Sequence, residues 1–106
     1  MPRTRTRLKS LEPEVTLSGA SAQRVFSGEK YVYGAIIYSD SGNSAAHIGG
    51  SDVNSDNGFP VAAEESFDLG ATLLYKADTG FDLGEVYIIG TSSDTFRVLY
   101  FERVDD

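Results

Sequence analysis

The chain offers few of the residue types that carry out covalent or metal chemistry. It has one histidine, His47, and no cysteine, so neither a catalytic triad nor a histidine-based metal cage can be assembled from it. The motif G-x-S-x-G is absent. Pairs among the 16 acidic residues could flank a glycosidic bond, but so many carboxylates on a small surface form pairs by chance. We therefore predict no enzyme, no catalytic residue and no cofactor, with His47 as an ordinary strand side chain.

Oxygen-bearing side chains occur at every second residue at the start of Asp52–Gly58, as in a calcium-binding loop. The match then fails, because the sixth position is Asn57 instead of glycine and the twelfth is Ala63, with Glu64 one place late. We predict no metal site here and expect a polar turn in which Asn and Asp side chains bond to nearby backbone groups. The two glycines before this segment precede neither a helix nor a lysine, so no phosphate-binding loop is predicted.

Charge is distributed unevenly along the 106 residues, which carry 9 basic and 16 acidic side chains and a net charge of −7. The first ten residues hold four of the basic side chains and no acidic one. We predict that residues 1–13 form an extended basic arm that docks on an acidic neighbouring surface. The acidic body repels a phosphate backbone, so nucleic-acid binding is not expected. The predicted partner-binding residues of the arm are Arg3, Arg5, Arg7 and Lys9.

From residue 14 onward the chain has the pattern of a single all-β domain. With 41% hydrophobic and 24% charged residues, its composition is that of a globular protein. Short apolar runs alternate with clusters of Gly, Ser, Asn and Asp, and no window has the period of an amphipathic helix. We predict a compact antiparallel β-sandwich or jelly-roll-like domain over residues 14–106. Its predicted strands are Val15–Leu17, Gln23–Phe26, Tyr31–Tyr38, Ala45–Ile48, Ser66–Leu69, Leu73–Tyr75, Glu85–Ile89 and Thr95–Arg103.

Several of these strands are apolar on both faces. In Tyr31–Tyr38, strict alternation places even-numbered and odd-numbered side chains on opposite faces, and both sets are apolar. One face can be buried in the domain's own core, and the second needs another cover. A small closed barrel with tyrosine hydroxyls in water would fit the pattern, but we favour a protein–protein interface and a homo-oligomer. The predicted interface side chains are Tyr33, Ile37, Tyr87, Ile89, Leu99 and Phe101.

The segment from His47 to Phe67 contains the runs Ile-Gly-Gly-Ser-Asp-Val and Asn-Gly-Phe-Pro-Val-Ala-Ala-Glu-Glu-Ser-Phe. It resembles a recurrent pattern in small structural proteins of tailed bacteriophages. The strand Tyr33–Tyr38 precedes it, and Asp82–Gly90 and Phe96–Phe101 follow it, so the resemblance covers roughly residues 20–104. The resemblance implies a compact β-sandwich that sits on the phage particle, as a capsid decoration or cement protein or as a head, neck or fibre component. It implies no catalytic residues.

The same segment can be explained as a loop design. We expect its two leading glycines to allow a sharp departure from a strand, and its Asn-Gly pair to supply positive φ. The Phe-Pro-Val run would then return apolar side chains to the core. The predicted structural residues of this loop are Gly49, Gly50, Asp52, Asn57, Gly58, Phe59 and Pro60.

These observations together predict a non-enzymatic bacteriophage virion protein, a capsid decoration or cement subunit that binds and stabilises the assembled head shell through its sandwich and its arm. The expected partners are the major capsid protein or other virion proteins, and further copies of the chain, with a trimer favoured. The expected location is the virion, after synthesis in the host cytoplasm. The sequence has no run of 18 apolar residues and no apolar stretch at its N-terminus, so we expect neither a membrane partner nor a secretory signal.

Two alternatives stay open from the sequence. The first is a neck, tail or fibre component of the virion, which copy number would separate from a decoration protein. The second is a carbohydrate-binding module, which would stack sugars on tyrosines although the chain has no tryptophan. The tyrosines concerned are Tyr31, Tyr33, Tyr38, Tyr75, Tyr87 and Tyr100.

Overall fold

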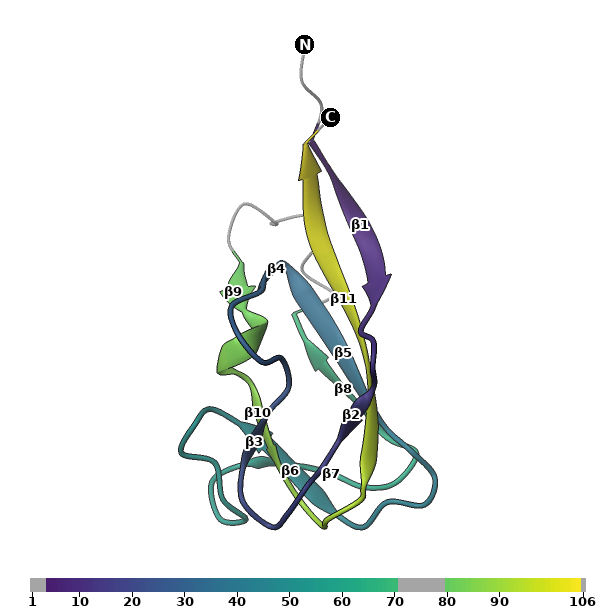
Figure 1. The fold of residues 1–106 in the computed structure, drawn as a ribbon, viewed down its shortest axis with the longest axis vertical. Coiled ribbons are helices and arrows are strands. Elements are labelled where there is room, and N and C mark those ends of the chain that lie inside the picture. Colours follow the sequence, from purple (N-terminus) through teal and green to yellow (C-terminus); the bar gives the residue numbers. More distant parts are fainter. Residues whose placement is uncertain (1–3, 71–79, 106) are drawn as a thin grey trace.

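The structure, a computed structural model, describes residues 4–70 and 80–105 and is all-β, as predicted (Figure 1). Among the described residues, one turn of 3-10 helix, η2 (Leu83–Glu85), follows strand β9. The predicted strand Leu73–Tyr75 lies outside the described residues. The observed strands are β1 (Thr4–Ser10), β2 (Val15–Thr16), β3 (Gln23–Arg24), β4 (Tyr31–Val32), β5 (Gly34–Ser39), β6 (Ala46–Gly49), β7 (Phe59–Val61), β8 (Ser66–Leu69), β9 (Phe81–Asp82), β10 (Tyr87–Ile89) and β11 (Thr95–Asp105).

The strands of the described residues form two main antiparallel sheets and one small one. The larger sheet has the order β1-β11-β5-β8, with β2 also paired to β11, and we call it the long sheet. The second has the order β3-β10-β6-β7, and β4 pairs with β9 in the small third sheet. Side chains from all three sheets meet in one core, which confirms the predicted β-sandwich.

The core consists of the inward-facing side chains of alternate strand positions. In β11 these are Phe96, Val98 and Tyr100, and in β10 the central Ile88 is fully buried. The alternate positions of these two strands, Tyr87, Ile89, Leu99 and Phe101, therefore lie outside the core, which agrees with their prediction as outward-facing side chains. Burial of each inward-facing side chain contributes about 1.5–3 kcal/mol relative to its exposure to water, so the alternation of apolar residues determines which face of each strand turns inward.

The N-terminal segment that the sequence predicts as an extended arm is a strand of the long sheet over residues 4–10. The partner of β1 is β11 over Leu99–Asp105, whereas β5 pairs with β11 only over Phe96–Phe101. Beyond Phe101, β11 is therefore no longer paired with β5 and continues as the partner of β1. We call this two-stranded extension the ribbon. Figure 1 shows it reaching beyond the other strands, along the 49 Å axis of a molecule that is 24 and 23 Å across.

The face prediction for Tyr31–Tyr38 was wrong, because a bulge interrupts the alternation at Tyr33. The backbone N–H of Tyr33 donates to the carbonyl of Phe101 (2.8 Å), and Phe101 is also the strand partner of Gly34. Tyr33 and Gly34 thus both lie opposite Phe101. This extra residue shifts the inward and outward alternation of the side chains by one position. Val32 and Ile37 consequently both face the core, and Ile37 is 0% exposed. Ile37, predicted at an interface, is a core residue.

The loop between β6 and β7 needs its glycines for close packing. A Cβ on Gly58 would lie 2.6 Å from Val53 Cγ2 and 2.7 Å from His47 Cβ, and a Cβ on Gly49 would lie 2.9 Å from the same Val53 atom. Positive φ angles occur elsewhere in the described residues, so the prediction of positive φ at Asn57-Gly58 was wrong. The absence of a side chain at these two glycines lets Val53 fold back on the end of β6.

The run Phe59–Val61 forms the edge strand β7. The sequence predicted that it returns apolar side chains to the core, and only one of them does so. Val61 is buried, but Phe59 is 64% exposed, with its ring centroid 5.4 Å from that of Phe67. Pro60 is the strand partner of His47, and a proline is tolerated there because an edge strand has one side without a ladder. His47 is a strand side chain of β6, as predicted.

A carboxylate fixes the start of η2. Asp82 Oδ1 accepts hydrogen bonds from the backbone N–H groups of Lys30 (2.9 Å) and Gly84 (2.8 Å). These two donors hold the pKa of Asp82 below its ordinary value, with Lys30 the larger cause. The bonds tie the β4 segment to the β9 segment at the base of the ribbon.

Candidate interaction surface

The surface of the long sheet that faces away from the core carries a stripe of apolar side chains, with polar and charged residues such as Asp68, Arg97 and Arg103 beside it. Residues directly opposite each other in an antiparallel pair lie on the same face, and the register pairs Leu8 with Phe101 and Leu99 with Ile36. Arg97 faces Tyr38 in the same way. Leu8 is 53% exposed, and the other apolar members are half-buried. We call this set, Leu8, Ile36, Tyr38, Leu99 and Phe101, the outer face.

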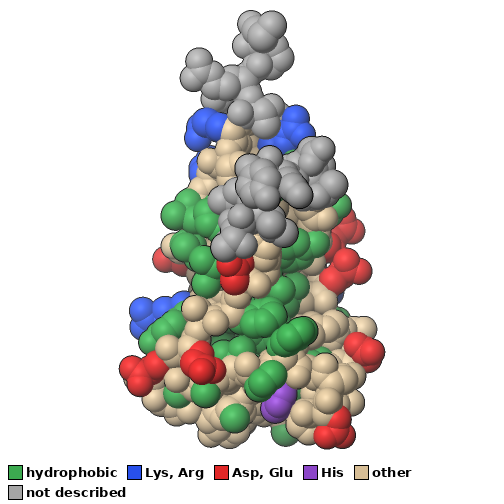
Figure 2. Space-filling model, turned by 180° about the vertical axis from the view of Figure 1, so that it is seen from behind, with side chains coloured by type: hydrophobic (Ala, Val, Ile, Leu, Met, Phe, Trp, Pro, Cys, Tyr) green, Lys and Arg blue, Asp and Glu red, His purple; other side chains and the backbone are tan. Residues whose placement is uncertain are grey.

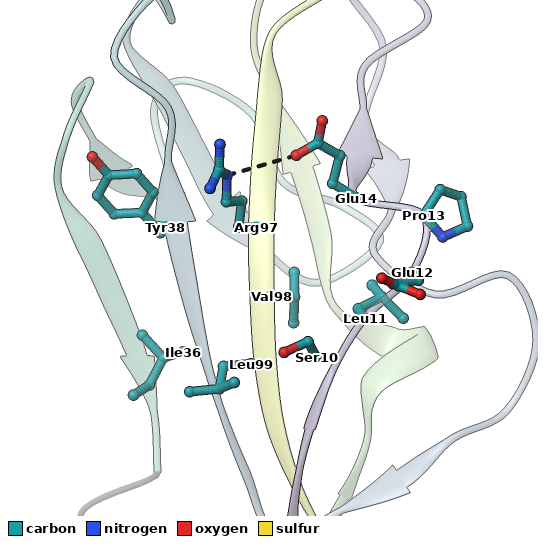
Figure 3. A pocket seen from close by; sticks show the side chains of 10 residues that line it. All are labelled: Ser10, Leu11, Glu12, Pro13, Glu14, Ile36, Tyr38, Arg97, Val98 and Leu99. Carbon is teal, nitrogen blue, oxygen red and sulfur yellow. Dashed lines mark ion pairs between the residues drawn. The ribbon is translucent and has the colours of Figure 1, made fainter.

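A groove of about 800 Å³ lies over part of the outer face. Figure 3 shows Ile36, Tyr38 and Leu99 along the strands of the sheet and the segment Ser10–Glu14 passing beside them. Charge lies at the rim, where Arg97 Nε is 3.7 Å from Glu14 Oε2 (Figure 3). An apolar floor with charged edges is typical of a protein-contact site.

Arg97 also contacts a second carboxylate, that of Asp40, at 3.2 Å. Its side chain is 70% exposed, so water screens both ion pairs and each contributes little to stability. Arg97 therefore remains accessible to a partner while Glu14 and Asp40 hold its position.

On the opposite surface of the long sheet from the outer face, a cluster of charged side chains connects the ribbon to the body of the molecule. Glu102 is only 9% exposed, and its Oε1 accepts from Arg7 Nη2 at 2.7 Å and from Arg7 Nε at 3.1 Å. Its other oxygen lies 2.9 Å from Lys30 Nζ, and that ammonium lies 5.4 Å from the centre of the Tyr100 ring. One carboxylate thus connects β1, β11 and the segment before β4.

The cluster lowers the pKa of Glu102 and raises the pKa of Lys30. The hydrogen bond from Lys30, followed by that from Arg7, holds the pKa of Glu102 below its ordinary value of 4.5. The hydrogen bond to Glu102 raises the pKa of Lys30 above its ordinary 10.5. Both shifts favour the charged forms, so the cluster is fully ionised at neutral pH.

The structure distributes the predicted arm cations along one strand. Arg3 lies outside the described residues, and Arg5, Arg7 and Lys9 occupy alternate positions of β1. Their register partners Val104, Glu102 and Tyr100 place them on the face opposite Leu8. Arg7 is engaged within the chain by Glu102, whereas the prediction assigned it to a partner.

The predicted interface side chains fall on separate surfaces. Leu99 and Phe101 belong to the outer face, and Tyr33 lies at the bulge beside Phe101. Tyr87 and Ile89 are half-buried on the second sheet, facing away from the buried Ile88. The sheets therefore do not bring these residues together into one patch.

Three members of the outer face were missed from the sequence: Leu8, Ile36 and Tyr38. The alternation of Thr and Arg before Leu8 is a strand signal that could have placed it, since a basic arm can also be a strand. Ile36 and Tyr38 could not be assigned to this face without knowledge of the bulge at Tyr33. Of the tyrosines considered as sugar platforms, Tyr100 is buried and Tyr75 lies outside the described residues.

The loop Asp52–Gly58 is the polar turn that the sequence predicts. Asn54 Oδ1 accepts from the backbone N–H groups of Asp56 (2.8 Å) and Asn57 (3.0 Å), and Asn57 Oδ1 accepts from that of Asn54 (2.7 Å). The carbonyl of Gly50 accepts from Val53 N–H at 3.0 Å and closes the turn before it. Within residues 4–70 and 80–105, no group of three or more His, Cys, Asp and Glu side chains is arranged to hold a metal ion.

A second hollow, of about 730 Å³, lies between Arg24, the loop residues 50–52 and Tyr87. The guanidinium of Arg24 is committed to backbone carbonyls, with Nε 2.8 Å from Gly84 O and Nη2 3.2 Å from Gly28 O. Because these bonds connect a turn to η2, Arg24 serves the fold at this position.

Figure 2 shows hydrophobic side chains gathered across the rear of the molecule and a group of basic side chains near the end that carries both termini. In the part of the chain that the structure describes, no helix is long and apolar enough to cross a membrane. No family model matches the chain, and no match was found among curated proteins or solved structures. The functional interpretation therefore depends on the chain's own residues.

Proposed function

We propose that this chain is a non-enzymatic structural protein of a bacteriophage virion, a decoration or cement subunit that binds the assembled head shell. The observation that carries the proposal is the outer face, an apolar surface on the long sheet that the chain itself leaves partly exposed. The sequence resemblance around His47–Phe67 to small phage structural proteins supports the same assignment.

The outer face supports an assembly role on physical grounds. Leu8 is 53% exposed, and it continues a line of apolar side chains through Phe101 and Leu99 to Ile36. Removal of such a surface from water yields about 25 cal/mol for each Å² of apolar area. An apolar stripe with charged residues at its rim is typical of a surface that a partner protein covers.

A subunit of this kind acts by binding to one state of its partner. If it binds the assembled shell and not free capsid protein, it stabilises the shell by mass action. Many weak sites repeated over a lattice add up through multivalency. In this proposal the major capsid protein is the partner, the copies associate as trimers, and the chain resides in the virion after its synthesis in the host cytoplasm.

A neck, tail or fibre position is the alternative within the same class. The outer face would serve either position, because both require a subunit that packs between neighbours. The number of copies in each particle separates them.

The proposal is tested with particles that lack the chain, compared with wild-type particles under heat and osmotic shock. Particles without the chain are expected to release their DNA at lower temperature, and addition of the purified protein is expected to restore stability. Protein carrying Leu99→Lys serves as the matched variant, because this change places a charge on the outer face and leaves the core intact. Equal stability of particles with and without the chain would refute a cementing role.

A further inference from the structure

We propose that the free edge of β1 is a docking site for an extended acidic segment of a partner protein, which adds to the long sheet as a further strand. This inference rests on the proposed assembly function and names the chemistry of one contact. It depends on three observations: the orientation of the β1 backbone, the pattern of its side chains and the exposure of its centre.

The backbone of β1 turns alternate residues toward its free edge. The N–H of Leu11 donates to the carbonyl of Val98 at 2.9 Å, and the β1–β11 register continues this pair through Lys9 and Tyr100 to Arg7 and Glu102. In an antiparallel ladder, hydrogen-bonded pairs alternate with pairs that do not exchange bonds. The odd-numbered residues of β1 therefore bond to β11.

The even-numbered residues Thr6, Leu8 and Ser10 consequently direct their N–H and C=O groups away from β11. No described strand lies on that side of β1, which is the terminal strand of the sheet. A row of unpaired backbone groups at a sheet edge is the template that peptide ligands use in strand addition. Leu8 adds a 53% exposed apolar contact at the centre of this edge.

The side chains of β1 select the charge of the added strand. Arg5, Arg7 and Lys9 share one face of the strand, and the residues opposite them in an added strand would share that face as well. Opposite charges in cross-strand pairs are favourable and like charges are unfavourable. Arg7 already binds Glu102, but the cluster as a whole holds two cations on one carboxylate, so it retains positive charge. An added strand with Glu or Asp at alternate positions fits this pattern.

The same rule disfavours a second copy of β1 as the occupant. Two copies paired edge to edge about a two-fold axis would place the basic face of one strand beside the basic face of the other. Cations along an edge are a known device against such self-pairing. The complementary occupant is therefore an acidic strand of another protein.

The experiment measures the binding of synthetic peptides to the intact purified chain by isothermal titration calorimetry at low and physiological salt. The first peptide alternates Glu and Thr over nine residues. A second has the same composition with its Glu residues grouped, so that total charge is equal and the alternate pattern is lost. Two further peptides have the alternating sequence with backbone N-methyl groups. One is methylated at the odd-numbered residues and the other at the even-numbered residues, so that each lacks the N–H donors of one edge of the added strand.

The alternating peptide is expected to bind at least about tenfold more tightly than the grouped one. Methylation of one of these two sets of residues is expected to abolish binding and of the other to leave it within about threefold, because only one edge of the added strand meets β1. Equal binding of all four peptides would overturn strand addition and leave a general electrostatic attraction. Equal or tighter binding of a DNA duplex would also overturn it, in favour of a phosphate-binding ribbon.

The protein side is tested by Thr6→Pro, with Thr6→Val as the matched control. Thr6 N–H points to the free edge, so proline there removes a docking donor without removing a bond to β11. Circular dichroism and the melting temperature verify that both variants fold. Thr6→Pro is expected to lose peptide binding by at least tenfold while Thr6→Val retains it.

Peptide binding that survives in folded Thr6→Pro would overturn the edge as the site. If Thr6→Pro instead abolishes self-association of the purified chain, the occupant is a second copy and the proposal is wrong. These readouts use purified protein alone, so their failure is distinguishable from a failure of the virion proposal, which is judged on particles.

Discussion

Replacement of Glu102 by glutamine tests whether one buried carboxylate holds the ribbon to the body of the molecule. Glu102→Gln keeps the size of the side chain and removes the charge that faces Arg7 at 2.7 Å and Lys30 at 2.9 Å. A hydrogen bond to a charged group contributes about 1.5–3 kcal/mol. The Arg7 and Lys30 side chains are 48% and 31% exposed, so solvent screening reduces both contributions. We expect a loss of about 1–2 kcal/mol in the free energy of unfolding at pH 7, discounted in this way.

Urea denaturation of the wild type and the variant at a series of pH values measures this loss. The pKa of Glu102 is lowered from 4.5 in the folded chain, so its stabilisation is complete above about pH 4.5 and declines as the pH falls through the lowered value. The difference between wild type and Glu102→Gln should therefore shrink in acid. Lys30 sets the limit at alkaline pH. Because its pKa in the folded chain is raised above 10.5, its contribution to stability is complete below pH 10.5 and declines as the pH rises through the raised pKa.

Glu14→Gln is the matched control, since Glu14 is 49% exposed and lies 3.7 Å from Arg97. We expect a change of less than about 0.5 kcal/mol for it. A double-mutant cycle with Arg7→Gln should give a coupling energy of about 0.5–1 kcal/mol with Glu102→Gln. If Glu102→Gln and Glu14→Gln unfold at the same urea concentration at pH 7, or if the loss persists unchanged in strong acid, the reasoning about the cluster is refuted.

Three further predictions concern the loop and the two faces of the long sheet. Gly58→Ala should lower stability by about 1–3 kcal/mol, because its Cβ would lie 2.6 Å from a neighbouring side chain. Gly42→Ala, with nothing within 4 Å of the added Cβ, should change it by less than about 0.5 kcal/mol in the same denaturation assay. Ile37→Lys should leave no folded protein by circular dichroism, whereas Ile36→Lys should fold normally and reduce the mass of any oligomer in light scattering. A folded Ile37→Lys together with an unfolded Ile36→Lys would contradict the assignment of the two faces. Asn54→Ala removes two hydrogen bonds of the polar turn and should cost about 1 kcal/mol, and unchanged urea unfolding would show that the turn does not need them.

The sequence predicted the fold where strict alternation of apolar residues holds. In β11, Phe96, Val98 and Tyr100 turn inward and Leu99 and Phe101 turn outward, as expected. This alternation can be predicted because Leu99 and Phe101 share their face with Arg97 and Arg103, and arginine side chains favour the surface.

The parity of Tyr31–Tyr38 could not be predicted in the same way. Both parities of this run are apolar, and the choice depends on a bulge at Tyr33 that forms through a hydrogen bond to Phe101, far along the chain. A contact between residues so distant in sequence leaves no local signal.

The role of the basic segment was predicted only in outline. Alternation of Thr with Arg indicates an extended chain, and residues 4–10 are extended. That β1 would pair with β11, and that Arg7 would bind Glu102, depends on the length by which β11 extends past β5. The positive φ predicted for the Asn57-Gly58 pair was also wrong, because Gly58 is needed for a close contact with Val53, which is a feature of packing and not of the local sequence.

The central claim, that the chain is a repeated structural subunit of a phage particle, is tested most directly by its copy number. In the proposed function the chain is encoded by a phage, and quantitative mass spectrometry of purified virions from its source would give its copies relative to the major capsid protein. The account predicts a ratio near one or a simple fraction of it, as a decoration lattice requires. A handful of copies in each particle would place the chain in the neck, tail or fibre, and its complete absence from the virion would contradict the account.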